Sequence, residues 1–325
     1  MKKILITGAG GFIGSHLVDA ALKANYKITA LIRYNSRNNW GWLENFYHKN
    51  LKIISGDVTN ADLINKLTKK HYAVIHLAAL IGIPYSYVAV ENYYETNVKG
   101  TLNILNSCKN NKVSRVLLTS TSEVYGTAKY TPIDELHPLQ AQSPYSASKI
   151  AADHLGEAYF KSFNLPVTIV RPFNAYGPRQ SSRAIIPTVI TQTLNKHDHV
   201  EIGNAKPSRD YNYVTDICDA FLEILKTKET IGETINISSG KEIKIGLLAK
   251  KIIEISGKNK KLKISKKRLR PKKSEVDQLL GSNKKIKKLT KWKPKVNFNE
   301  GLKKTYEWFS KQDQSSILKS KLYIV

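Results

Sequence analysis

Two side chains that can transfer a proton together occur in the segment SPYSASK (residues 143–149). Tyr145 and Lys149 are four residues apart, so on a helix they share one face. A lysine ammonium beside a phenol favours the phenolate, and we therefore predict a lowered pKa for Tyr145. A tyrosinate near neutral pH is a base that can remove the proton of a substrate hydroxyl. Thr121, just past an apolar run, supplies a hydroxyl that can hold the same substrate oxygen.

A carboxylate follows Thr121 by two residues, in the segment STSEVYG (residues 120–126). Glu123 is either a solvated loop residue or part of an active site. Because it shares a short loop with Thr121, its carboxylate can reach the same side of a bound substrate. The predicted catalytic residues are therefore Thr121, Ser122, Glu123, Tyr145 and Lys149.

A glycine-rich turn, GAGGFIG, follows the first apolar run and precedes an amphipathic stretch. Glycines allow a tight turn and a close backbone approach, while the N–H groups at the start of a helix attract a pyrophosphate. The strand–turn–helix context favours a dinucleotide site over a turn without a ligand. The residues predicted to contact the dinucleotide here are Gly8, Gly11, Phe12, Ile13 and Gly14.

Three further strand ends are predicted to line the same cofactor. The second strand ends with Arg33, without the acid that binds the ribose of NAD, so we predict a modest preference for NADP. The alternative is that Arg33 stacks on the adenine and both cofactors bind. His76, beside these contacts, is predicted to be structural. The other predicted cofactor contacts are Asn35, Ser36, Asp57, Val58, Leu77, Ala78 and Ala79, together with Tyr145 and Lys149.

These residues need strands whose ends meet. Short apolar runs alternate with amphipathic stretches through the first half of the chain, a pattern typical of βαβ units in a parallel sheet covered on both faces. We predict an α/β fold, a Rossmann-type doubly wound parallel sheet with a smaller C-terminal substrate-binding lobe. The predicted strands are Lys3–Thr7, Lys27–Ile32, Lys52–Ser55, Ala73–Leu77, Arg115–Thr119, Val167–Arg171 and Thr234–Ile237.

The pattern changes after Arg171, where the chain becomes rich in Pro, Gly, Asn and Arg. We predict a cofactor-binding domain made of residues 1–171 and about 209–240, and a substrate-binding lobe made of residues 172–208 and about 241–325. Asp216–Leu225 is predicted to be a helix that returns to the main sheet. About a dozen residues at the C-terminus are predicted to form a loose tail.

The net charge of +26 is unevenly placed, because residues 241–325 hold 26 lysines and arginines against 7 acidic residues. Nucleic-acid binding is one interpretation. Lysine exceeds arginine, aromatic residues are sparse and no nucleic-acid-binding motif occurs, so we favour solvated lysines and predict no nucleic-acid partner.

Cys108 and Cys218 lack metal-site spacing, and no segment reaches the roughly 20 apolar residues of a membrane span. We therefore predict a cytoplasmic protein without a metal site or membrane contact.

Over nearly its whole length, the sequence resembles the extended short-chain dehydrogenase/reductases that modify nucleotide sugars. The shared motifs are GAGGFIG, GDV, HLAA, NVKGT, STSEVYG, YSASK, RPFNAYGP and RDYNYVTD. Within that family, the segments at residues 34–43, 78–87 and 268–276 are most similar to nucleotide-sugar 4,6-dehydratases of legionaminic acid pathways. The resemblance implies an NAD(P)-dependent enzyme of cell-surface polysaccharide biosynthesis that acts on GDP- or UDP-N-acetylglucosamine and retains its cofactor through turnover.

The T-S-E sequence at residues 121–123 leaves related reactions open. In dehydratases that act on dTDP-glucose this loop reads T-D-E, with an aspartate acid where this chain has Ser122. GDP-mannose dehydratases have T-S-E, with Glu as the main acid/base. The resemblance thus implies that Glu123 is the acid/base catalyst, assisted by Ser122. UDP-glucuronate decarboxylases share T-S-E too, but their SPYSASK segment looks different, and a C4 epimerase needs only the Tyr, Lys and Thr. A non-catalytic nucleotide-binding or basic interaction protein is the remaining alternative, and the intact Thr121, Tyr145 and Lys149 argue against it.

The resemblance also implies where the nucleotide-diphosphate sugar binds. Arginines suit a diphosphate because the guanidinium fork matches phosphate oxygens. A homodimer through the helix of Tyr145 and Lys149 is a further expectation from the family. The implied substrate-binding residues are Ser86, Asn174, Arg183, Ala184, Arg209 and Arg270.

Overall fold

The computed structural model describes residues 1–36 and 39–312. Its main layer is a seven-stranded sheet with the order β10-β6-β5-β4-β1-β2-β3, and all neighbouring strands are parallel. The predicted doubly wound parallel sheet is thus confirmed, and each predicted strand is present with ends shifted by no more than one residue. The strands are β1 (Lys3–Thr7), β2 (Lys27–Arg33), β3 (Leu51–Gly56), β4 (Ala73–His76), β5 (Arg115–Thr119), β6 (Val167–Pro172) and β10 (Thr234–Ile237).

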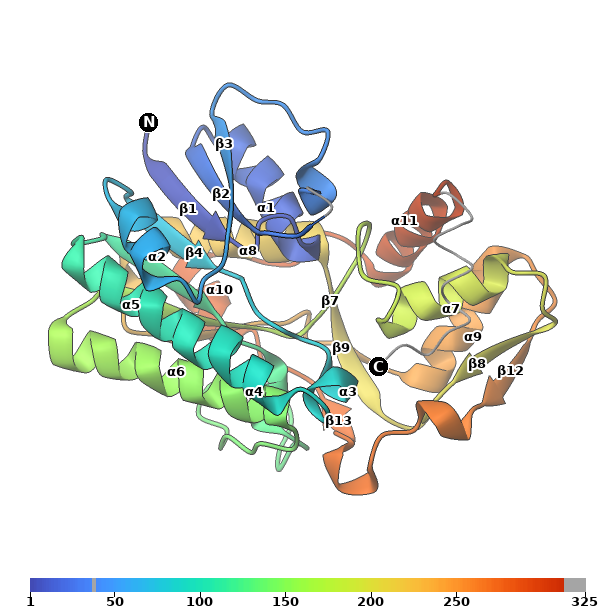
Figure 1. Ribbon diagram of the computed structural model, residues 1–325. Helices are drawn as coiled ribbons and strands as arrows, with labels where there is room; N and C mark the ends of the chain where they lie inside the picture. Colours follow the sequence, from blue (N-terminus) through green and yellow to red (C-terminus); the bar gives the residue numbers. More distant parts are fainter. Residues whose placement is uncertain (37–38, 313–325) are drawn as a thin grey trace.

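Helices cover both faces of this sheet (Figure 1). One face packs against α1 (Phe12–Lys23), α8 (Val214–Lys226) and α10 (Lys284–Thr290), and the other against α2 (Ala61–Thr68), α5 (Gly100–Asn110) and α6 (Pro144–Phe163). Along β1, Ile4 and Ile6 belong to the first core and Leu5 to the second. Because both faces of a strand are buried, its sequence is a continuous apolar run rather than an alternating one.

The strand order reverses next to β1, because β2 and β3 lie on one side of it and β4, β5 and β6 on the other. Such a switch point opens a crevice at the carboxyl ends of the strands, where ligands bind in open α/β sheets. The glycine-rich turn follows β1, Arg33 ends β2, Asp57 follows β3, His76 ends β4 and Thr121 follows β5. The fold therefore brings the predicted cofactor and catalytic motifs to one edge of the sheet.

The second lobe is built around β9 (Ser208–Tyr213), which pairs with β7 (Asn174–Tyr176), β11 (Glu242–Lys244) and β13 (Gln278–Leu279). A separate parallel pair joins β8 (His199–Ile202) and β12 (Lys261–Ile264). Helices α7 (Ile185–Leu194), α9 (Ile245–Ser256) and α11 (Phe298–Ser310) pack on these strands around a third apolar core. The chain returns to the main sheet with α8, a few residues later than predicted, because residues 209–213 belong to β9 of the smaller sheet. The rest of the division into two lobes by residue number stays a prediction.

Within residues 1–36 and 39–312, no helix is both long and apolar enough to cross a membrane. Cys108 and Cys218 are buried free cysteines. The predicted C-terminal tail lies outside the described residues.

Candidate active site

The glycine-rich turn packs its backbone against the segment that follows β4. Gly8 has φ +68°, and a Cβ atom at this position would lie 2.7 Å from Ala78 N and 2.9 Å from the carbonyl carbon of Leu77. Only glycine combines this backbone conformation with so close an approach. Gly11 begins α1 without a side-chain cap, so the first N–H groups of the helix remain for a ligand. These features fit the pyrophosphate of a dinucleotide. The neighbouring predicted contacts, Phe12, Ile13, Gly14 and Ala79, lie in the same two segments.

The ends of β2 and β3 bring two predicted adenosine contacts together. Arg33 Nε lies 3.9 Å from Asp57 Oδ2, and both side chains are substantially exposed. Asn35 Nδ2 donates to the Asn39 carbonyl at 2.7 Å, which shapes the loop that also contains the exposed Ser36. A 2′-phosphate at Arg33 would meet a guanidinium that already faces a carboxylate. Val58, by contrast, is buried, and its carbonyl accepts a hydrogen bond from Asn103 Nδ2 at 3.0 Å.

Thr121 and Glu123 occupy one tight turn after β5. Thr121 Oγ1 accepts a hydrogen bond from the backbone N–H of Glu123 at 3.2 Å and so caps the 3-10 helix η3 (Ser122–Tyr125). This cap holds the backbone of Glu123 beside the Thr121 hydroxyl. Ser122 is buried between them.

Tyr145 lies at the buried start of α6, where Ser143 Oγ accepts a hydrogen bond from Ser146 N at 3.1 Å. Burial raises the pKa of Tyr145, a hydrogen bond with Thr121 lowers it, and the charge of Glu123 raises it again. The predicted lowering of this pKa is therefore wrong in this structure, because desolvation outweighs the charges and Lys149 Nζ donates to the Thr119 carbonyl at 2.6 Å. The same interactions place Thr121, Glu123 and Tyr145 together.

An aromatic wall stands beside Tyr145. Its ring contacts that of Tyr93 edge-on, with centroids 6.1 Å apart, and both belong to a small apolar cluster with Ile83. Burial raises the pKa of Tyr93 to about 12, while its hydrogen bond with the Gly82 carbonyl and the charge of Arg183 oppose this rise. Sequence reasoning missed Tyr93, for which the only signal is its place just before the NVKGT motif. The wall is formed by α3 (Ile83–Ser86) and the end of α4 (Val90–Tyr93), which the π-helix η2 (Tyr94–Lys99) follows.

Two other predicted substrate residues have local roles in the structure. Ser86 is fully buried, and its hydroxyl donates to the Ile83 carbonyl at 2.7 Å within α3. Ala184 is the residue before α7, and its carbonyl accepts from Thr188 N at 2.9 Å. Their contacts with a sugar stay predictions.

Two arginines of the second lobe share one carboxylate. Arg209 Nη2 and Arg270 Nη1 each lie 3.7 Å from Glu275 Oε1, which leaves an excess positive charge suited to a diphosphate. Asn174 and Tyr211 face each other across β7 and β9. Among the described residues, the buried atoms Asn174 Oδ1 and Tyr211 Oη have no hydrogen-bond partner. Buried polar atoms normally have one, so Tyr211 is a further candidate contact that sequence reasoning missed.

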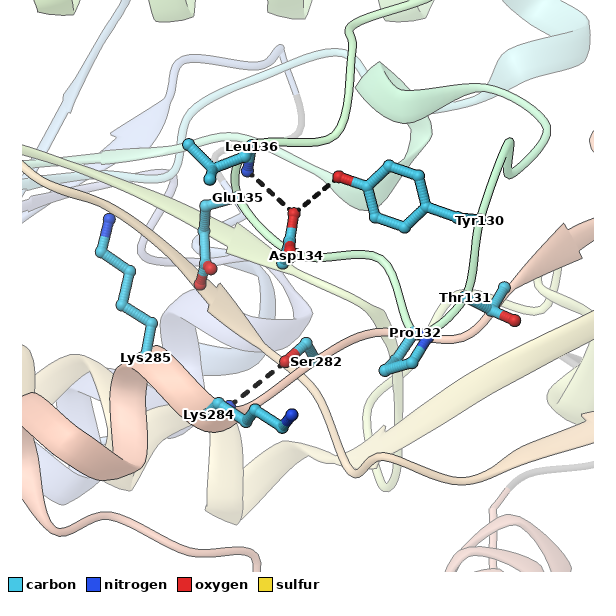
Figure 2. A pocket seen from close by; sticks show the side chains of 9 residues that line it. All are labelled: Tyr130, Thr131, Pro132, Asp134, Glu135, Leu136, Ser282, Lys284 and Lys285. Atoms are coloured by element: carbon cyan, nitrogen blue, oxygen red, sulfur yellow. Dashed lines mark hydrogen bonds between the residues drawn. The ribbon is translucent and has the colours of Figure 1, made fainter.

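A cavity of about 530 Å³ lies apart from all of these residues, beside the edge strand β10 (Figure 2). Asp134 accepts hydrogen bonds there from Tyr130 Oη at 2.8 Å and from Leu136 N at 3.1 Å. Glu135 Oε1 accepts from Asn236 N of β10 at 2.9 Å, which satisfies an exposed sheet edge. No predicted site residue lines this cavity, so we assign it to the structure of the edge and not to the active site. Its lining is Tyr130, Thr131, Pro132, Asp134, Glu135, Leu136, Ser282, Lys284 and Lys285.

Comparison with known proteins places this geometry in a family. Residues 5–305 match the family described as GDP-mannose 4,6 dehydratase. The chain belongs to this family of nucleotide-sugar dehydratases and epimerases. It is 32% identical over 325 residues to the dTDP-D-glucose 4,6-dehydratase of Homo sapiens, in a match that covers 95% of this chain and 90% of the human protein.

Solved structures of both reaction types superpose on this family member. The dTDP-glucose 4,6-dehydratase of Bacillus anthracis in complex with NAD has a TM-score of 0.84 at 30% identity, covering 97% of this chain and 98% of that one. The UDP-glucuronic acid 4-epimerase of Bacillus cereus, in complex with UDP-glucuronic acid and NAD, has a TM-score of 0.87 at 31% identity, covering 94% and 98%. The predicted extended short-chain dehydrogenase/reductase family is confirmed, and these NAD complexes support the predicted NAD(P) cofactor.

Proposed function

We propose that this enzyme is a 4,6-dehydratase that converts UDP- or GDP-N-acetylglucosamine into the 4-keto-6-deoxy sugar in legionaminic acid biosynthesis. The observation that carries the proposal is the capped turn that holds Glu123 beside Thr121 and Tyr145. A 4-epimerase needs a base only at the C4 hydroxyl. Elimination also needs a base for the C5 proton and an acid for the C6 hydroxyl, and Glu123 supplies this second group.

The proposed cycle uses the side chains in order. Tyr145 removes the proton of the C4 hydroxyl, whose oxygen Thr121 binds. NAD(P)+, held by the turn at Gly8 and the start of α1, would supply the hydride chemistry at C4 and C6 and would be retained through the turnover. The C4 ketone acidifies the C5 proton, which Glu123 removes, and Glu123 with help from Ser122 protonates the departing C6 hydroxyl. Water leaves, and C6 would receive the hydride. C5 regains a proton by way of solvent, which balances the proton that Tyr145 took from the C4 hydroxyl, and the 4-keto-6-deoxy sugar forms.

The substrate is proposed to span the two lobes. Arg209 and Arg270 bind the diphosphate because together they exceed the charge of Glu275, and Arg183 approaches from the side of the aromatic wall. Asn174 and the start of α7 at Ala184 complete the diphosphate side, while Ser86 lies behind the sugar.

Mass spectrometry of the product tests the proposal. Purified enzyme is incubated with UDP- and GDP-N-acetylglucosamine, and we expect loss of one water from one of them. An unchanged mass with an altered sugar means epimerisation and contradicts the proposal. In Glu123→Gln the turn cap remains because the cap uses the backbone N–H, so we expect cofactor and substrate binding to persist and turnover to fall about 10²- to 10⁴-fold. Unchanged turnover in this variant would rule out the assigned role of Glu123.

The preference between NAD and NADP is a separate proposal. Arg33 supports NADP, and the nearby Asp57 carboxylate, 3.9 Å away, opposes a 2′-phosphate. Dissociation constants for both cofactors, measured on the wild type and on Arg33→Ala, test the assignment. We expect the substitution to weaken NADP more than NAD; a clear preference of the wild type for NAD would contradict it.

We also propose a homodimer through α6. Exposed apolar side chains on the adjoining segments support this contact, since Val90 of α4 is 52% exposed, Tyr94 of η2 is 58% exposed and Phe163 at the end of α6 is 50% exposed. Light scattering across a range of protein concentrations measures the mass, and a monomer at all concentrations would contradict the proposal.

A further inference from the structure

A buried row of charged groups extends from Lys149 into the protein. Asp153 lies one helical turn after Lys149 on α6 and is 1% exposed. Its Oδ2 accepts hydrogen bonds from Ser120 Oγ at 2.8 Å and from Arg171 Nε at 3.0 Å. Arg171, on β6, is 2% exposed, and its Nη1 donates to Tyr125 Oη at 3.1 Å. The carboxylate is therefore held rigidly between two strands and the catalytic helix.

Lys149 and this carboxylate lie on the same face of α6, four residues apart. Burial lowers the pKa of Lys149, and Asp153 is the neighbour that raises it. The other groups near the ammonium are the Thr119 carbonyl on β5, which accepts its hydrogen bond, and His76 on β4. His76 carries no charge at neutral pH because burial, followed by the Lys149 charge, lowers its pKa to about 3. Asp153 is thus a buried carboxylate one helical turn from Lys149 that favours its charged form.

Arg171 is the charged partner of Asp153 and favours its ionised form. Burial raises the pKa of Asp153, while the charge of Arg171 and the hydrogen bond from Ser120 lower it. A guanidinium does not lose its proton in proteins, so the positive partner of Asp153 is permanent. The aromatic ring of Tyr125 lies 5.0 Å from this guanidinium and fixes its far side.

We propose that Asp153 is a positioning residue that maintains Lys149 as an ammonium in the cofactor site, with Arg171 as its fixed counter-ion. The inference rests on the proposed function in one respect, the contact of Lys149 with the nicotinamide end of NAD. An ammonium donates stronger hydrogen bonds than a neutral amine, and it would stabilise a phenolate at Tyr145, which burial otherwise disfavours. A merely structural Asp153–Arg171 pair would stabilise the fold without affecting the ionisation of Lys149.

The ionisation of Lys149 can be followed through the dissociation constant of NAD+, measured by calorimetry between about pH 7 and about pH 10. This measurement needs no sugar substrate. We expect the affinity of the wild type for NAD+ to weaken above the pH at which Lys149 loses its proton, which gives a break in the plot of the dissociation constant against pH. Lys149→Met should show no such break. In Asp153→Asn the break should move down by about one pH unit or more, because loss of a nearby opposite charge shifts a pKa by about 1–3 units. Ser120→Ala removes a hydrogen bond from the same carboxylate oxygen without changing charge, so its break should stay at the wild-type pH.

Two outcomes would overturn the proposal: a break unchanged in Asp153→Asn, or a break retained in Lys149→Met. If Asp153→Asn does not fold, because Arg171 is left unpaired, the double variant Asp153→Asn with Arg171→Gln removes both charges, and its break must still lie below that of the wild type. The measurement needs only NAD+, so it stands even if the mass test finds no dehydration.

Discussion

His76 lies between two hydroxyl groups, that of Thr7 at the end of β1 and that of Thr101 on α5. Its Nδ1 lies 2.7 Å from Thr7 Oγ1 and its Nε2 lies 3.2 Å from Thr101 Oγ1, and the side chain is buried. A neutral imidazole has one donor and one acceptor nitrogen, which two hydroxyls can satisfy. Burial, with a smaller effect of the Lys149 charge, lowers the pKa of His76 to about 3. We predict that this residue makes the protein less stable in acid.

The effect of His76 on the free energy of unfolding depends on how many protons the folded and unfolded chains bind at each pH. The unfolded chain binds a proton at His76 below about pH 6.5, whereas the folded protein does not until about pH 3. The contribution is therefore fully present above the unfolded pKa and is lost progressively as the pH falls toward the folded one. Each pKa unit is worth about 1.36 kcal/mol, so moving from about pH 7 to about pH 5 should lower the free energy of unfolding by about 2 kcal/mol through His76 alone.

Urea unfolding of the wild type and His76→Gln at the two pH values isolates this contribution. The variant retains hydrogen-bonding groups but does not titrate at this position. Only the wild type should therefore lose the His76 contribution, so its free energy of unfolding should fall by about 2 kcal/mol relative to that of the variant at the lower pH. His16 and His71, whose pKa values burial also lowers, are present in both proteins and cancel in the comparison. A difference that is equal at both pH values would refute the buried-histidine reasoning.

Three further substitutions test the site. Tyr145→Phe keeps the ring contact with Tyr93 and removes the phenol, so steady-state kcat should fall about 10²- to 10⁴-fold while calorimetry shows retained NAD affinity; an active variant would dismiss Tyr145 as the base. Gly8→Ala places a Cβ 2.7 Å from Ala78 N at positive φ, so thermal unfolding should show a loss of about 1–3 kcal/mol and a smaller shift on adding NAD; a wild-type response would contradict this. Arg209→Lys keeps the charge but loses the fork, so KM for the nucleotide sugar should rise about tenfold or more with little change in kcat; an unchanged KM would exclude Arg209 from diphosphate binding.

The main sheet could be predicted from the sequence because its strands are buried on both faces. Runs such as Ile4–Ile6 and Val116–Leu118 are wholly buried, which makes them readable without any alternation. Their carboxyl ends meet at one edge, so Gly8, Arg33 and Thr121 could be placed together before any side-chain contact was known. Parallel topology thus converts three distant motifs into one site.

The second lobe and the pKa of Tyr145 could not be predicted as well from the sequence. Strands β7, β11 and β13 have only two or three residues each, too few to show a period. The segment Ser208–Tyr213 is buried at nearly every position despite its polar residues, so its sequence did not reveal that it pairs within the small sheet. The pKa of Tyr145 was predicted in the wrong direction because helical spacing reports the neighbouring charge and says nothing about desolvation.

The turn at Thr121 explains why the fold alone does not identify the reaction. A dehydratase and an epimerase superpose on this chain with TM-scores of 0.84 and 0.87, so the difference between them must lie in individual side chains. Thr121 caps the turn through the backbone N–H of residue 123, a contact that does not use the Glu123 side chain. The carboxylate can therefore be removed by substitution without removing this cap. On the proposed mechanism Glu123 is the group that separates elimination from epimerisation, and this makes the side chain at position 123 the decisive one to test.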